Sequence, residues 1–75
     1  MQIRVNLMGG LKSQSPENNT LDLPEGSTID DLLAALDVDP AFVQTVMVNS
    51  KPQKDRSRVI FVDDELTLLP PVGGG

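Results

Sequence analysis

The stretch from Leu69 to Gly75 contains the residues whose types and spacing could do chemistry. Two prolines and a valine lead into Gly73, Gly74 and Gly75, whose last member carries the terminal carboxylate. Glycine has no Cβ, so a glycine run can pass through a narrow channel, and the prolines stiffen the stem before it. The pattern predicts a tail that presents the Gly75 carboxylate to another protein. A tail without a role and an expression remnant are the alternatives.

The side chains offer few other groups for catalysis. The 75 residues include no cysteine and no histidine, which removes the usual thiolate nucleophile, the usual general base near neutral pH and the commonest metal ligand. An enzyme would have to work with Asp, Glu, Lys or Ser alone. We therefore expect a protein that is not an enzyme and that binds no metal or cofactor of its own.

The charge of the chain bounds its partners. The formal net charge is −5, which has the wrong sign for binding nucleic acid. An acidic surface favours basic protein partners, although it can also serve solubility alone. No apolar run approaches the roughly 20 residues of a membrane span, and the first residues lack the apolar region of a signal peptide. We expect a cytoplasmic protein that contacts neither membrane nor nucleic acid.

Alternating apolar residues predict the elements that must position the tail. Ile3, Val5 and Leu7 alternate with polar residues, which indicates a strand with one buried face. Gly9 and Gly10 end this strand. The polar stretch from 12 to 19 is typical of a loop. The alternation returns at Thr20–Leu23, which we expect to pair with the first strand as an antiparallel hairpin.

A helix is predicted after this hairpin. Ser27 or Thr28 can cap its first turn, where Asp30 and Asp31 also suit the helix dipole. The stretch 37–40 ends the helix, because a residue before proline avoids helical geometry. The helix carries an apolar stripe at helical spacing, formed by Ile29, Leu32, Leu33 and Leu36.

The second half of the chain contains shorter patterns. A third strand is predicted within Phe42–Asn49 and a turn at 50–52. Val59–Val62 fits either a fourth strand or packed coil. Leu66–Leu69 is the last strand, and the prolines after it end its pairing. The order predicts an α+β protein of the β-grasp (ubiquitin-like) class, with a mixed sheet of four to five strands on one main helix.

This class divides the chain into a β-grasp domain, residues 1–69, and a flexible glycine tail, residues 70–75. The final strand can lie beside the first, in the middle of the sheet. That arrangement places the tail directly after a central strand.

The chain resembles the ubiquitin-like sulfur carriers, that is, the small subunit of molybdopterin synthase and the sulfur carrier of the thiazole pathway. The resemblance covers nearly the whole length, and its most specific motif is the closing one. It rests on Ile3-Arg4-Val5, on Gly26-Ser27-Thr28-Ile29 before Leu32-Leu33, on Val48-Asn49, and on Pro70-Pro71-Val72 before Gly74-Gly75.

The resemblance implies a carrier whose tail is activated by a partner. An E1-like adenylating enzyme would use ATP to adenylate Gly75, and a sulfur donor would convert the adenylate to a thiocarboxylate. Gly73 and Gly74 would thread the tail into each active site. The acceptor would be a cofactor-forming enzyme, in first place the large subunit of molybdopterin synthase and otherwise thiazole synthase. A protein modifier joined through Gly75 and an interaction module with an inert tail remain alternatives.

Several residues are candidates for docking the partner. Leu69, Pro70 and Val72 lead into the tail, and Met47 lies on the predicted third strand. Met47 and Leu69 would form an apolar patch together with Phe42 if all three lay on the sheet face away from the helix. The alternative is that Phe42 caps the core and Met47 fills a gap.

The sequence departs from the family pattern at two places. Val62-Asp63-Asp64-Glu65 stands where the family usually has an Asp-Gly-Asp turn. Gly73 stands where the family usually has Ser, Thr or Ala. Two non-glycine residues can still form a type I turn. We interpret the carboxylates of Asp63, Asp64 and Glu65 as part of a solvated turn rather than a metal site. We likewise interpret the basic side chains as a solvated loop: Lys51, Lys54, Arg56 and Arg58.

Overall fold

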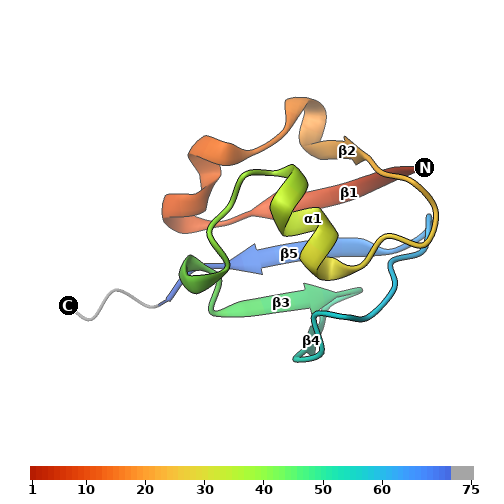
Figure 1. Cartoon of the computed structure of the whole chain (residues 1–75). Coiled ribbons are helices and arrows are strands. Elements are labelled where there is room, and N and C mark those ends of the chain that lie inside the picture. The colour runs from red at the N-terminus through yellow and green to blue at the C-terminus, as the bar shows by residue number, and fades with distance from the viewer. Residues whose placement is uncertain (72–75) are drawn as a thin grey trace.

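The computed structural model describes residues 1–71, which form a five-stranded sheet, one α-helix and three short 3₁₀ helices (Figure 1). The strand order across the sheet is β2-β1-β5-β3-β4. The elements in chain order are β1 (Gln2–Leu7), η1 (Gly9–Gln14), η2 (Glu17–Asn19), β2 (Thr20–Asp22), α1 (Ile29–Ala35), η3 (Pro40–Phe42), β3 (Thr45–Val48), β4 (Lys51–Gln53) and β5 (Glu65–Leu69).

The last strand lies in the centre of the sheet, as predicted. β5 pairs in parallel with β1, where Val5 lies opposite Leu66, and antiparallel with β3, where Val46 lies opposite Leu68. β1 and β2 form the predicted antiparallel hairpin. This is the β-grasp arrangement, so the predicted fold class is confirmed.

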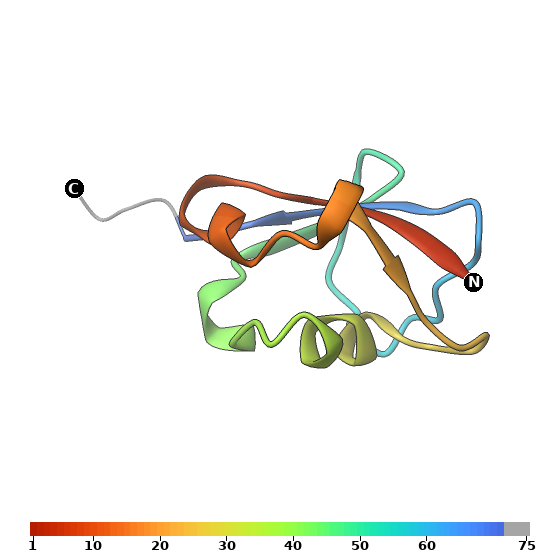
Figure 2. The same cartoon turned by 90° about the horizontal axis from the view of Figure 1, so that it is seen from above.

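The core lies between one face of the sheet and α1. Figure 2 shows the helix covering that face as a second layer. Because strand side chains alternate, every second residue of β1, β3 and β5 points inward. The side chains that are almost completely buried are Ile3, Val5, Ile29, Leu32, Leu33, Val46, Ile60, Leu66 and Leu68.

Both ends of α1 are fixed by local hydrogen bonds. The Thr28 hydroxyl accepts from the Asp31 N–H at 3.2 Å, and the Asp31 carboxylate accepts from the Thr28 N–H at 2.9 Å. This reciprocal capping box selects Thr28 from the two predicted caps. At the other end Asp37 adopts a φ of 57°, and the Val38 N–H donates to the Leu33 carbonyl at 3.1 Å. The helix therefore ends close to the predicted position.

The first two corrections concern segments before β3. The predicted loop at 12–19 contains the end of η1 and all of η2. The predicted third strand does not reach back to Phe42, because Pro40 opens η3 and the Asp39 carboxylate accepts from the Ala41 N–H at 2.9 Å. β3 begins at Thr45 instead.

Two further corrections concern the segments between β3 and β5. Residues 51 and 52 of the predicted turn belong to strand β4, and the turn lies one residue earlier, where Asn49 and Ser50 adopt φ values of 53° and 70°. Val59–Val62 is coil rather than a fourth strand, with a single bridge between Val59 and Thr28, and only Ile60 of this segment packs in the core. Within residues 1–71, no helix is long and apolar enough to cross a membrane.

Candidate functional site: the root of the tail

The site predicted from the sequence falls partly outside the structure. Val72, Gly73, Gly74 and Gly75 lie outside the described residues, so their predicted roles stay predictions. The structure does describe the root of the tail, by which we mean Leu69, Pro70 and Pro71 with the residues that contact them.

Backbone hydrogen bonds hold the end of β5 on both sides. The Met8 N–H donates to the Leu68 carbonyl at 3.1 Å, and the Gln44 N–H donates to the Leu69 carbonyl at 2.8 Å. Pro70 and Pro71 have no N–H to continue the ladder. Sheet pairing therefore stops at Leu69, and the tail leaves the domain from a fixed point.

Gly9 makes a close contact with the tail root. Its φ is +54°, and a Cβ at this position would lie 2.9 Å from Cγ of Pro70. A larger residue would therefore meet both backbone strain and a steric clash. The sequence indicated only that Gly9 and Gly10 end the first strand. Gly10 has no atom within 4 Å of its own Cβ position, so Gly9 alone carries this constraint.

A hollow of about 240 Å³ lies beside the root, between η1 and η3. Leu11, Gln14 and Phe42 line it together with Pro70 and Pro71. Phe42 is 61% exposed, so the interpretation that it caps the core is wrong. The hollow offers an apolar surface directly where the tail leaves.

Met47 and Leu69 lie on the outer face of the sheet, as the docking prediction requires. Met47 pairs with Thr67, and Leu69 pairs with Thr45, so both side chains point away from α1. Both are half-buried. Phe42 belongs to η3 and lines the hollow at the root instead, so the three residues do not form one patch on a sheet face.

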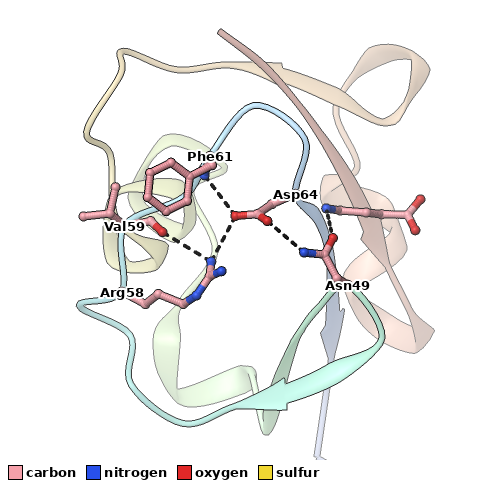
Figure 3. A network of polar contacts seen from close by, with 6 residues as sticks. Asn49, Arg58, Val59, Phe61 and Asp64 are labelled. Atoms are coloured by element: carbon pink, nitrogen blue, oxygen red, sulfur yellow. Dashed lines mark hydrogen bonds and ion pairs between the residues drawn. The ribbon is translucent and has the colours of Figure 1, made fainter.

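The other end of β5 holds a polar network that sequence reasoning missed (Figure 3). Asp64 is only 7% exposed and accepts three hydrogen bonds. They come from the Asn49 side-chain amide at 2.8 Å, the Phe61 N–H at 2.9 Å and the Arg58 guanidinium at 3.0 Å. The interpretation of Asp64 as part of a solvated turn is therefore wrong.

The network shifts the acidity of Asp64. Burial by itself raises the pKa of its carboxyl. The hydrogen bonds from Phe61, Asn49 and Arg58, with the positive charge of Arg58, outweigh burial and lower this pKa below its ordinary value. Asp64 therefore stays ionised and works as a structural anchor. Within residues 1–71, no group of three or more carboxylates gathers closely enough to hold a metal ion.

Two of the basic side chains are structural as well. Arg58 forms the ion pair with Asp64, and Arg56 donates to the carbonyls of Pro40 and Val43 at 3.1 and 2.5 Å. The interpretation of this stretch as a solvated loop is therefore wrong for Arg56 and Arg58. A turn without glycine does form here, because the Asp64 N–H donates to the Phe61 carbonyl at 2.9 Å without a positive φ in between. Its central residues are Val62 and Asp63, one position before the predicted Asp63 and Asp64.

Comparison with known proteins identifies the family of the chain. Its fold is similar to that in a crystal structure of SAMP1 from Haloferax volcanii, with a TM-score of 0.72 and 24% sequence identity over 100% of both chains. A family model described as the ThiS family matches residues 5–75, which is nearly the whole chain and includes the glycine tail. The chain belongs to the ThiS family.

This membership confirms the resemblance to the ubiquitin-like sulfur carriers. Members of the family are small carriers and modifiers rather than enzymes themselves. No curated protein matches the chain.

Proposed function

We propose that the chain is a sulfur carrier that works through the carboxylate of Gly75. The observation that supports this proposal most is the family match, because it runs from residue 5 through the glycine tail to residue 75. The geometry of the root agrees with it, since a central strand and Gly9 fix the point where the tail leaves.

The chemistry needs two steps in a partner enzyme. A carboxylate is a poor acyl donor, so an oxygen of Gly75 first attacks the α-phosphate of ATP and pyrophosphate leaves. Hydrosulfide then attacks the carbonyl carbon of the acyl-adenylate, AMP leaves, and a thiocarboxylate remains once the sulfur loses its proton. The E1-like enzyme binds the ATP, and the carrier supplies only the reacting end.

The tail and its root have separate roles in this proposal. Gly73 and Gly74 thread the reacting end into each active site, because they lack side chains. Leu69, Pro70 and Val72 contact the partner where the tail enters it. Met47 extends this contact across the outer face of the sheet.

The acceptor is an enzyme that builds a sulfur-containing cofactor. We place the large subunit of molybdopterin synthase first, because the tail reads Pro-Pro-Val before its glycines. Thiazole synthase is the second candidate. It is favoured by the match to the family model named ThiS. We expect both steps to take place in the cytoplasm.

Intact mass spectrometry tests the proposal. The chain is incubated with an E1-like enzyme, ATP and a sulfide source, with a sample lacking ATP as the control. The proposal predicts a mass gain equal to the replacement of one oxygen by sulfur, located on Gly75. An unchanged mass, together with adducts linking Gly75 to lysines in a cell lysate, would favour a protein modifier and contradict the carrier.

A further inference from the structure

An exposed apolar cluster lies at the end of the molecule opposite the tail root. Val59, Phe61 and Val62 are 38%, 62% and 58% exposed. They account for three of the five large apolar residues with exposed side chains in the described part of the chain. Because β5 starts directly after them and ends at the root, its full length separates the two regions (Figure 1).

The backbone that carries this cluster is firmly held. The Ile60 N–H donates to the Ser27 carbonyl at 2.8 Å, and the Ile60 side chain is 1% exposed. The Phe61 N–H donates to the buried Asp64 carboxylate, while Figure 3 shows the Phe61 ring turned away from that carboxylate. The exposure of Phe61 is therefore a property of a fixed segment, and the ring is presented to solvent in a defined position.

The cluster borders a hollow of about 570 Å³. Met1 and Gly26 line this hollow together with residues 59–62, and so do the acidic residues Glu25 and Asp63. We call this surface the end patch. It combines an apolar floor with exposed carboxylates, which is the composition of a binding surface with a polar rim.

The exposed side-chain charges around the end patch are carboxylates. Glu25 and Asp63 are exposed, and the side chain of Asp22 nearby is 83% exposed. Two cations beside the end patch are already engaged. The amino group of Met1 donates to the Leu23 carbonyl at 2.7 Å and pairs with the Asp22 carboxylate at 3.4 Å, and Arg58 pairs with Asp64 at 3.0 Å. Glu25 and Asp63 are therefore the rim carboxylates left for a partner.

This charge pattern selects among possible occupants. A second copy placed symmetrically on the end patch would bring two acidic rims together, which is unfavourable. The tail of another copy would bring its own carboxylate to the same rim. A protein segment with lysine or arginine beside a large apolar side chain meets both the hollow and the rim.

We propose that the end patch binds a partner protein through a segment in which a large apolar side chain is flanked by basic residues. The large side chain packs against Phe61 and Val62, and the basic residues pair with Glu25 and Asp63. Because the end patch and the root lie at opposite ends of β5, one partner can hold the chain here while another acts on the tail.

Selection from a random peptide library displayed on phage tests the proposal, with the full chain as bait. The proposal predicts recovered peptides that combine an aromatic residue or leucine with lysine or arginine. A synthetic copy of the most frequent peptide should shift the amide NMR signals of residues 59–63. Its affinity should fall about tenfold or more with Phe61→Ser, as expected for a central anchor, and should weaken further with added salt.

Phe42→Ser is the matched control, because Phe42 is 61% exposed and lies at the other end of the molecule. It should leave the peptide affinity unchanged. The proposal is overturned if no peptide is recovered, if the peptides are acidic, or if both variants bind equally well. It is also overturned if sedimentation shows a dimer of the chain that Phe61→Ser dissociates, since a second copy would then occupy the patch. None of these outcomes bears on the chemistry of Gly75.

Discussion

The two ends of β5 are held by different kinds of contact. At its start, the side chains of Asn49 and Arg58 form a network around the buried carboxylate of Asp64. At its end, the hydrogen bonds to Leu68 and Leu69 are made by backbone groups alone. The nearest side-chain constraint there is the space that Gly9 leaves for Pro70.

This difference separates stability from function. A side-chain network fixes the turn before β5 and the end of β3, so it secures the fold. The root needs only a fixed exit, and side chains that reached over it would hinder a tail meant to enter a partner. We therefore expect changes at the start of β5 to reduce stability and changes at its end to reduce activation of the tail.

Removing the carboxylate of Asp64 should have the largest effect on stability. Asp64→Ala leaves three donors without their acceptor, and we expect a loss of about 2–3 kcal/mol in the free energy of unfolding. Urea unfolding measures this loss. Asp63→Ala is the control. Asp63 is the exposed neighbour of Asp64, so this variant should change stability by less than about 0.5 kcal/mol. Equal losses in the two variants would contradict the importance of the network.

Adding a methyl group at Gly9 should affect stability and tail activation at the other end of β5, where the tail leaves the domain. Gly9→Ala meets a positive φ and the ring of Pro70, so we expect a loss of about 1–2 kcal/mol and slower adenylation by the E1-like enzyme. Gly10→Ala, which meets no atom within 4 Å, should change neither quantity.

A double variant isolates the contact between Gly9 and Pro70. Pro70→Ala removes the ring atom that lies 2.9 Å from the added methyl group. In this background the cost of Gly9→Ala should shrink by about 0.5 kcal/mol or more. Strictly additive costs would show that the backbone strain alone matters.

The stability of the fold should fall in acid through Asp64. Its folded pKa is lowered from 3.8, so its contribution is complete above that value and is lost as the pH falls through the folded pKa. Unfolding measured against pH should therefore show the wild type approaching Asp64→Asn as the pH drops below about 4. A gap that stays constant with pH would contradict the ionised network.

The smallest effect is expected for Gln14 in η1. Its side-chain amide donates to the Asp37 carbonyl at 2.6 Å in an exposed position. Gln14→Ala should therefore lower stability by about 0.5 kcal/mol or less, as measured by thermal unfolding. A loss as large as that of Asp64→Ala would show that side chains also hold the tail end of the domain.

The sequence predicted the fold because its periodic patterns are local. Ile3, Val5 and Leu7 alternate, the helix stripe follows at helical spacing, and prolines mark the end of β5. These signals need no knowledge of distant neighbours. The glycine tail was also visible, since it is a run of neighbouring residues.

The features that the sequence did not reveal depend on distant partners or on unusual backbone. Asn49 and Asp64 are 15 positions apart and meet only once β3 and β5 are paired. The Asn49-Ser50 turn lacks the glycine that marks many two-residue turns, although asparagine tolerates the positive φ. Gly9 looked like an ordinary strand end, because its contact with Pro70 spans nearly the whole chain.

The exchange of radioactive pyrophosphate into ATP tests the central claim most directly. The E1-like enzyme is supplied with the full chain, with a chain lacking Gly74 and Gly75, or with Asp64→Asn at a temperature where it is folded. We predict exchange with the full chain and with Asp64→Asn, and none with the truncated chain. Exchange that persists without the two glycines would contradict the claim that the chain works through its terminal carboxylate.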